Sequence, residues 1–351
     1  MDTLSSEFAN RNQETFESPR NISSANIESL LQGASILSSG GGGNYDTALS
    51  NYQSISPGPV DVRNISDFSD SDTLATVFGL GPVENQIDDE LSTASESVRL
   101  FEERYGEIDG VVLGEIGPDL IVEAVLIANE LGVPVVNADV AGMRAVPSIQ
   151  NEIIEETMVS RTPVVATNGE KTLNVESGSG RDIEASLRDV GKRDLWYVTG
   201  YANSPSDYSE AVQGWFEECL EFNRASISRL GEGQVYSIET TQSQGHSVGR
   251  IEIRGDESFE VFFLNENILA FRDGEVISQA PDTISIVDER GIGISNGNLP
   301  EIGETVELYE LSYGFWQNTQ CLNLESLGVQ LQNGQVMFDS GPSFEVNHYD
   351  E

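Results

Sequence analysis

Apolar residues recur at helical spacing in several segments of the first half of the chain. From Ile27 to Leu37 they fall every three or four residues, which predicts an amphipathic helix. This helix must end before Gly40–Gly43, because four consecutive glycines cannot continue it. Residues 91–105 carry a weaker helical pattern, and the continuous apolar run Leu74–Leu80 predicts a buried strand.

The best-defined unit combines two strands and a helix. The β-branched run Asp109–Leu113 is followed by the helical pattern of Leu120–Leu131, by Gly132 as a cap, and by a second apolar run, Val133–Val136. Strand, helix and strand in so short a stretch predict a βαβ unit and therefore a parallel sheet. Pro163–Ala166 adds a further candidate strand.

The second half has a different texture. We expect a helix over Tyr208–Arg229, after the loop signal Asn203–Ser206. From Gly233 onwards short β-branched and aromatic runs alternate with turn residues such as Asp273-Gly274, which predicts strands. These runs are 234–239, 248–254, 259–264, 284–287 and 306–311.

The predicted fold class is α/β. We expect an N-terminal three-layer α/β domain with a largely parallel sheet over residues 25–232, followed by a smaller β-rich domain over residues 233–345. Residues 1–24 read as a flexible polar and acidic tail, and residues 346–351 as an acidic tail.

Carboxylates greatly outnumber basic groups. The 351 residues include 59 Asp and Glu against 18 Lys and Arg, a formal net charge of −41, and only Lys171 and Lys192 are lysines. So negative a field repels phosphates and anionic lipids, so we expect neither nucleic acid nor a membrane as a partner. The carboxylates are spread over every segment, as on a surface adapted to molar salt, where the Debye length falls to about 3 Å. We expect a salt-adapted protein of haloarchaeal type; an ordinary acidic protein is the alternative, which the scarcity of lysine disfavours.

The chain offers no sign of export. Its first 21 residues are polar and contain no apolar core, unlike a signal peptide. No apolar run approaches the length of a membrane-spanning helix, about 18 residues. We therefore expect a cytoplasmic location. Cys219 and Cys321 stand far apart without a CxxC pattern, which predicts buried structural thiols rather than a disulfide or zinc site.

Histidine content limits the available chemistry. With only His246 and His348, a multi-histidine zinc site is excluded, and no GxSxG segment supports a serine triad. If a divalent metal binds, carboxylates such as Glu115, Asp139 or Asp282 must hold it.

Two glycine-containing loops carry the first candidates. The tetraglycine and Asn44 let the backbone approach a ligand and present amides to an oxygen atom, although a flexible linker has the same composition. The segment Glu115–Asp119 follows a predicted parallel strand, where open α/β sheets bind ligands. Glu115 can act there as a general base, whereas Asp119 is explained equally well as a helix cap.

A third loop follows the neighbouring strand. Asp139 and Arg144 lie five residues apart on a segment that contains Gly142. Because basic residues are scarce, Arg144 should have a specific partner. That partner is either a carboxylate of the substrate, held by two hydrogen bonds, or Asp139 itself in a structural ion pair.

These loops belong to a set of segments that occur in a fixed order. In the first half they are GASILSSGGGGNY (33–45), GLGPVE (79–84), GEIG (114–117) and PVVNADVAGMRAVPSIQ (134–150). In the second half they are FLNENILAF (263–271), APDTISIVD (280–288) and GETVELYELSYGFW (303–316). Together they resemble the S-methyl-thiohydantoin desulfurase-like family, which accompanies hydantoin-processing enzymes.

The resemblance implies a hydrolase acting on a thiohydantoin or hydantoin-like ring, or a non-catalytic partner of hydantoinase- or oxoprolinase-type subunits. A ligand sensor without turnover and a homo-oligomer are also compatible with the sequence. For the enzyme we expect the site at the sheet edge facing the second domain, with Glu115 or Asp139 activating water and Arg144 anchoring a carboxylate of the small-molecule substrate. The other expected contacts are Gly41, Gly42, Gly43 and Asn44 by their amides, and Asn265, Glu266 and Asp282 from the β-rich domain.

Overall fold

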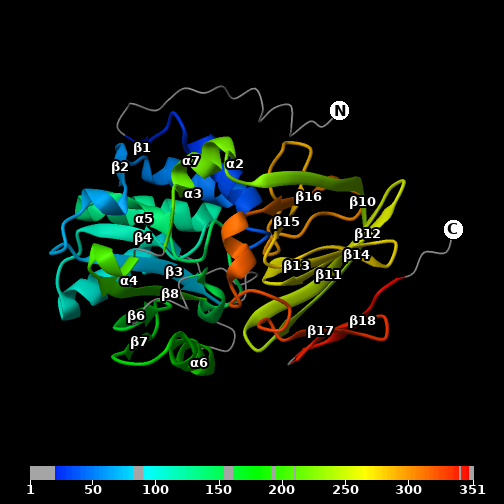
Figure 1. Cartoon of the computed structure of the whole chain (residues 1–351). Helices are drawn as coiled ribbons and strands as arrows, with labels where there is room; N and C mark the ends of the chain where they lie inside the picture. Colours follow the sequence, from blue (N-terminus) through cyan, green and yellow to red (C-terminus); the bar gives the residue numbers. More distant parts are fainter. Residues whose placement is uncertain are drawn as a thin grey trace.

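The computed structural model describes residues 20–81, 90–153, 161–190, 195–208, 211–339 and 341–347. Residues 1–19 of the expected tail, residues 82–84 of the GLGPVE segment and His348 lie outside these ranges. Within them, an N-terminal α/β domain and a C-terminal β-rich domain lie side by side (Figure 1). None of the helices in the described ranges is long and apolar enough to cross a membrane.

The first domain contains one sheet. Its strand order is β1-β2-β5-β4-β3-β8-β6-β7, and β9 pairs with β5. The strands are β1 (Asn21–Ile22), β2 (Val60–Arg63), β3 (Leu74–Leu80), β4 (Gly110–Leu113), β5 (Val135–Asp139), β6 (Val164–Thr167), β7 (Thr172–Val175), β8 (Trp196–Asn203) and β9 (Val212–Gln213).

This sheet is mixed, whereas the sequence predicts a largely parallel one. The neighbours β2, β5, β4 and β3 are parallel, as the βαβ pattern predicts. On the far side of β3, the strands β8, β6 and β7 all pair antiparallel. For the pair of β6 and β7 the reason is the short turn between them, where the Asn168 side chain accepts the N–H groups of Glu170 and Lys171. So short a connection can only join antiparallel strands.

Helices cover the two faces of the sheet unequally. Buried apolar residues of α2, α3, α4 and α5 form one core against the sheet, whereas Ile183 and Leu187 of α6 pack on the opposite face with short 3-10 turns. The expected third layer is therefore present only in part. The helices are α2 (Ile27–Leu37), α3 (Tyr45–Ile55), α4 (Glu90–Tyr105), α5 (Pro118–Leu131), α6 (Gly180–Val190) and α7 (Trp215–Glu221).

Local signals explain where helices α2 and α5 end. Helix α2 stops at Leu37, as the glycines predict. Helix α5 begins with Pro118 in its first turn and ends at Gly132, whose φ of 71° suits glycine. The helix predicted over Tyr208–Arg229 is wrong. Of its described residues, only the seven of α7 are α-helical, because Phe222 turns left-handed with φ 49° and the chain enters a strand at Ser226.

The second domain is built on a seven-stranded antiparallel sheet with the order β14-β13-β12-β11-β10-β16-β15. All five predicted strand runs lie within its strands. These are β10 (Ser226–Ser243), β11 (His246–Arg254), β12 (Ser258–Leu264), β13 (Glu266–Arg272), β14 (Glu275–Gln279), β15 (Thr283–Val287) and β16 (Thr305–Ser312). A small sheet follows, with β17 (Val329–Gln332), β18 (Gln335–Phe338) and β19 (Ser343–Glu345).

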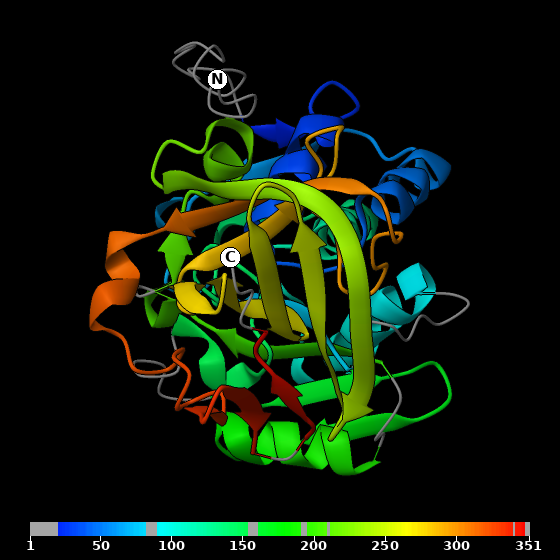
Figure 2. The same ribbon diagram turned by 90° about the vertical axis from the view of Figure 1, so that its right-hand side faces the viewer.

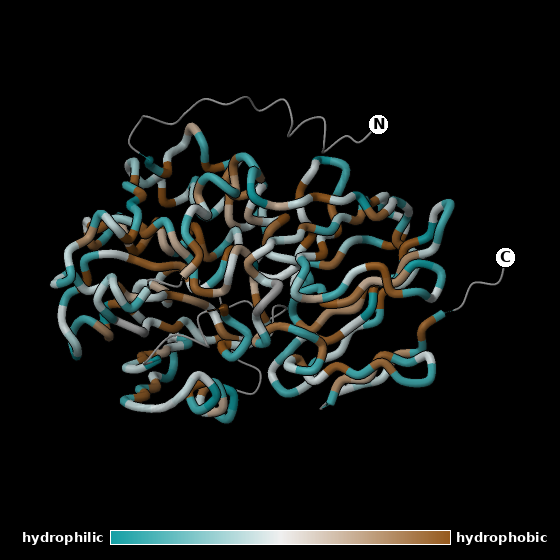
Figure 3. The backbone as a smooth tube through the Cα atoms, in the orientation of Figure 1, coloured by the Kyte–Doolittle hydropathy of each residue, from teal (hydrophilic) through white to brown (hydrophobic). Residues whose placement is uncertain are grey.

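The two domains pack directly against each other. Figure 2 shows the long strand β10 curving along the second sheet, so that the β10–β11 hairpin reaches down to α6 of the first domain. Hydrophobic segments follow the inner strands of both sheets, and hydrophilic segments form most outer loops (Figure 3). Buried residues of α2 and of β15 belong to contiguous packing across the boundary, which fixes the loop after α2 against the second domain.

Candidate functional site

A cleft lies where loops of the first domain meet the second domain. It encloses about 860 Å³, part of it open to solvent. Its walls come from the loop after α2, the ends of β3 and β4, the first turns of α5, and helix α6, and from two segments of the second domain. The lining residues used below are Gly42, Gly43, Asn44, Glu115, Asp119, Pro147, Arg188, Asn265 and Glu266.

The glycine loop is held in place by close backbone packing. Gly42 has a φ of 63°, and a Cβ atom there would lie 2.6 Å from the Cα of Gly117. The Asp119 N–H donates to the Gly42 carbonyl at 3.1 Å, and the Asp119 carboxylate accepts the Asn44 N–H at 3.1 Å. Within the described residues the N–H groups of Gly42 and Gly43 have no protein acceptor. They are therefore available to an oxygen atom of a ligand.

Polar contacts tie this loop to the second domain. The buried Ser39 hydroxyl lies 3.0 Å from the Asn267 carbonyl and 3.1 Å from the Ile284 carbonyl, with one proton to donate to them, and the Asn267 N–H donates to the Ser39 carbonyl at 2.6 Å. Asn296 donates its N–H to the Gly40 carbonyl at 2.7 Å. The glycine loop is thus a rigid part of the domain boundary, and the flexible-linker interpretation does not apply to it.

Glu115 follows β4 directly and faces the cleft. Its carboxylate accepts the Val146 N–H at 3.2 Å. Burial raises the pKa of Glu115 from 4.5 to about 8, against the lowering effect of this hydrogen bond, and the nearby carboxylates of Glu152 and Asp139 raise it further. A carboxyl group with such a pKa exchanges its proton near neutral pH, as general acid-base catalysis requires.

Glu266 approaches Glu115 from the second domain. It is 2% exposed, and its Oε2 atom has no hydrogen-bond partner among the described residues. Burial raises the pKa of Glu266 well above its usual range, and the charge of Glu115 raises it further. The side chain lies against Gly41, where a Cβ atom would come within 2.2 Å of Oε1. The cleft therefore holds two mutually interacting carboxyl groups, of which at least one keeps its proton at neutral pH.

Asp139 lies behind the cleft rather than in its lining. Its Oδ1 atom accepts the N–H groups of Gly142 at 2.6 Å and Met143 at 3.1 Å, so the carboxylate organises its own loop. Trp316 clamps the same loop by donating its indole N–H to the Gly142 carbonyl at 3.0 Å. Burial raises the pKa of Asp139 to about 7, partly offset by these N–H donors.

Arg144, the expected anchor of a substrate carboxylate, lies outside the cleft lining. It is fully buried and donates to the carbonyls of Pro281 at 2.5 Å and Asp282 at 3.2 Å, and to Ala145 at 3.0 Å. Among the described residues, Arg144 also forms no ion pair with Asp139, the alternative partner that the sequence suggests. The cation instead joins the two domains through backbone oxygens and stabilises the ionised forms of Glu266 and Glu115.

The sequence comparisons identify both parts of the chain. Residues 25–177 match the S-Me-THD-like N-terminal domain, and residues 201–318 match the S-Me-THD-like C-terminal domain. The chain belongs to the S-Me-THD-like family. No curated protein matches it. Among solved structures, the crystal structure of a protein from Chromobacterium violaceum is similar, with a TM-score of 0.71 at 21% identity, covering 86% of this chain and 94% of that one.

In this S-Me-THD-like chain, the remaining expected residues play different parts. Asn265 lines the cleft, but its side chain accepts the Ser247 N–H at 2.8 Å and holds the strand from which Glu266 projects. Asp282 lies outside the cleft lining and meets Arg144 through its backbone carbonyl. In the described ranges, no three His, Cys, Asp or Glu side chains form a group that could hold a metal ion.

Two cleft residues were not predicted as ligand contacts. Asp119 was explained as a helix cap, yet its carboxylate fixes the Asn44 amide. Arg188 of α6 is the cation in the cleft lining, held by Glu184 at 2.7 Å and by the carbonyls of Gly245 and Pro147 at 2.5 and 3.1 Å. The scarcity of basic residues that drew attention to Arg144 applies equally to Arg188, but no motif surrounds it.

Proposed function

We propose that the protein is a hydrolase acting on thiohydantoin or hydantoin-like five-membered rings, with its active site in the interdomain cleft. The observation that carries the proposal is the convergence of Glu115, Glu266 and two unpaired glycine amides on one hollow. A base near neutral pKa, a protonated acid and oxyanion donors are the groups that hydrolysis of an amide-like carbon needs.

In this mechanism, water adds to the ring carbon that bears the sulfur substituent. Ionised Glu115 removes the proton from that water as the carbon–oxygen bond forms. The negative charge that develops on the ring is stabilised by the N–H groups of Gly42 and Gly43. The carbon–sulfur bond then breaks, and a carboxyl proton of Glu115 or Glu266 passes to the departing thiolate. As the carbonyl forms, the proton of the added hydroxyl passes to the ring nitrogen. Each water consumed thus yields one ring carbonyl and one thiol.

The electrostatics assign different tasks to the two cations. Arg188 has unused N–H groups and lines the cleft, so it takes the role of holding a substrate carboxylate that the sequence suggested for Arg144. Arg144 positions the pair of carboxyl groups from behind.

The enzyme is favoured over a non-catalytic partner because large exposed apolar side chains are spread over α5, β10, β14, β17 and a loop: Leu131, Ile227, Tyr236, Val276, Ile302 and Leu331.

The test is turnover of S-methyl-thiohydantoin, thiohydantoin and hydantoin, with and without a carboxylate side chain, in molar KCl. Thiol release is followed with a thiol reagent and ring opening by absorbance. We expect Glu115→Gln to lower turnover by about 10²–10⁴-fold, the usual contribution of a general base. Glu102→Gln is the matched control, because the Glu102 carboxylate also accepts one backbone N–H, from Ile108, far from the cleft. Absence of turnover of every ring by the unmodified protein would reject the proposal.

A further inference from the structure

A second cavity lies between α6 and the tip of the β10–β11 hairpin. It encloses about 710 Å³, part of it open to solvent, and its lining shares Pro147 and Arg188 with the cleft. Figures 1 and 2 both show the hairpin tip next to α6, and Arg188 donates to the Gly245 carbonyl in that tip. Arg188 therefore lies between the cleft and this second cavity and lines both of them.

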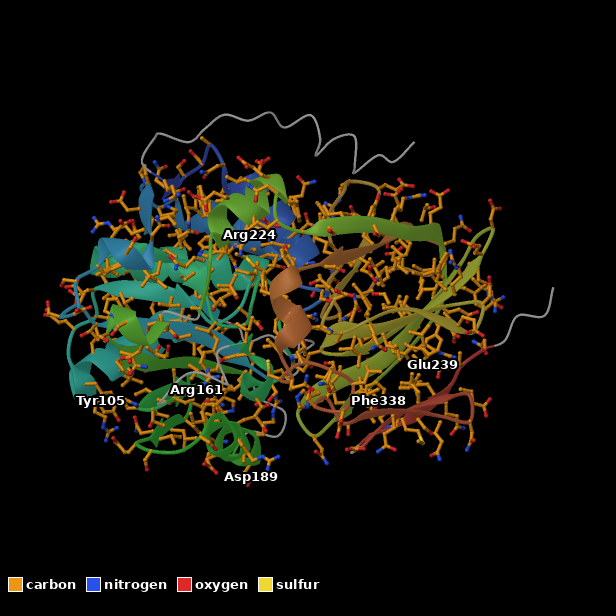
Figure 4. All side chains as sticks on the ribbon, viewed as in Figure 1. Tyr105, Arg161, Asp189, Arg224, Glu239 and Phe338 are labelled. Carbon is orange, nitrogen blue, oxygen red and sulfur yellow. The ribbon has the colours of Figure 1, made fainter. Side chains whose placement is uncertain are left out.

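The charge in this cavity is opposite to that of the protein. Two arginines, Arg181 and Arg188, and the imidazole of His246 line it, in a chain with only 18 Lys and Arg residues against 59 acids. Red oxygen atoms lie all around the outline of the molecule in Figure 4. The one lining carboxylate, Glu184, is already bonded to Arg188, to the Ser148 hydroxyl and to the Ile149 N–H. Among the charged side chains that line the cavity, two arginines therefore stand against one carboxylate.

Hydrogen-bond donors in the cavity remain unused. Arg181 donates its Nε to the Gln150 side chain at 3.3 Å, and its terminal nitrogens donate to no residue that the structure describes. The His246 Nε2 lies 3.0 Å from the Pro147 carbonyl. Burial and the charge of Arg188 lower the pKa of His246 to about 3, so its imidazole is neutral at pH 7 and senses any change in that charge.

We propose that this cavity is a binding site for a small oxyanion ligand, a carboxylate or a phosphate, separate from the cleft. Arg181 and Arg188 present planar sets of donors that match both groups, and a planar guanidinium is the usual partner of such ligands. The surrounding negative surface disfavours anions everywhere else, so an anion that binds at all has a reason to bind here. The site stands whether or not the cleft hydrolyses rings.

The experiment measures binding of succinate and of inorganic phosphate by calorimetry in 1 M KCl, where the Debye length of about 3 Å removes long-range attraction. NMR of the imidazole groups follows the same titration, with His348 as internal reference. We expect binding with a shift of the His246 signals, and at least tenfold weaker binding in Arg181→Gln. The matched control is Arg99→Gln, an exposed arginine of α4 that pairs with Glu103.

The results separate the alternatives. Binding of one anion only identifies the ligand as a carboxylate or a phosphate and supports the site. Absence of binding of both anions to the unmodified protein overturns the proposal. Equal weakening in Arg181→Gln and Arg99→Gln also overturns it, because the attraction would then belong to the surface as a whole. Circular dichroism of both variants confirms that each is folded before titration.

Discussion

Replacing Glu115 with glutamine should remove activity and, at alkaline pH, stabilise the protein. The substitution keeps the shape of the side chain and an oxygen that can accept the Val146 N–H, and removes only the charge. Because burial raises the pKa of Glu115 from 4.5 to about 8, the folded protein holds a proton there that the unfolded chain releases. Stability from this group is complete below pH 4.5 and is lost as pH rises to about 8.

The size of the effect follows from the same shift. One pKa unit corresponds to about 1.4 kcal/mol, so the full change from 4.5 to about 8 corresponds to about 5 kcal/mol. Glu266 interacts with Glu115 and also releases its proton at high pH, so the single substitution removes only part of the total. We expect Glu115→Gln to exceed the parent protein in free energy of unfolding by about 2–4 kcal/mol at pH 9, and to match it within about 1 kcal/mol at pH 4.5.

Urea unfolding in 2 M KCl at pH 4.5, 7 and 9 measures this difference, and thiol release measures activity on the same samples. Glu102→Gln, on the outer surface, should leave both the pH dependence of stability and the activity unchanged. A Glu115→Gln variant that is equally or less stable than the parent at pH 9 would show that ionisation of the Glu115 carboxyl group does not lower the free energy of unfolding. The assignment of Glu115 as a buried base would then fail.

Four further outcomes test other parts of the structure. Gly42→Ala should destabilise the fold by about 1–3 kcal/mol through the 2.6 Å approach to Gly117, while Gly58→Ala, with nothing within 4 Å, stays within about 0.5 kcal/mol. Arg144→Met should cost about 3 kcal/mol in urea unfolding, because three carbonyls lose their donor; an unchanged midpoint would refute its bridging role. Asp139→Asn should keep turnover within tenfold, because an amide oxygen can still accept the loop N–H groups; a hundredfold loss would assign it a catalytic role. The Tm should rise steadily from 0.1 to 2 M KCl because of the net charge of −41, and a constant Tm would contradict salt adaptation.

Sequence reasoning succeeded where local signals act alone. The helix over Ile27–Leu37, the strand over Leu74–Leu80 and the βαβ unit depend on apolar spacing and on glycine caps, and all are confirmed. The position of Glu115 at the edge of a parallel strand followed from the same unit. These features are fixed by neighbours in the chain, so the sequence alone carries them.

Features that depend on the second domain escaped prediction. Arg144 and Arg188 are two of the few basic residues of the chain, and their sequence surroundings do not distinguish them. Only the tertiary packing decides that Arg144 faces backbone carbonyls and that Arg188 faces the cleft. The antiparallel strands β6 and β8 carry the same apolar pattern as parallel ones, since burial on two faces looks alike in both cases. The helix α7 was overpredicted because Trp215 and Phe216 are buried by tertiary contacts rather than by a continuing helix.

The net charge of the chain and the raised pKa values of the cleft carboxyl groups have separate physical causes. For Glu115 and Glu266 the leading cause of the raised pKa is burial, and the next is their immediate neighbours. The other carboxylates act from farther away, and in molar salt an interaction across more than a few ångströms is screened. Without screening, the negative net charge would raise the pKa of every carboxyl group in the cleft. With screening, it is compatible with a base that ionises near neutral pH. The pair is buried because it is assembled from two domains, which the hydrogen bonds of Ser39 and Arg144 hold together.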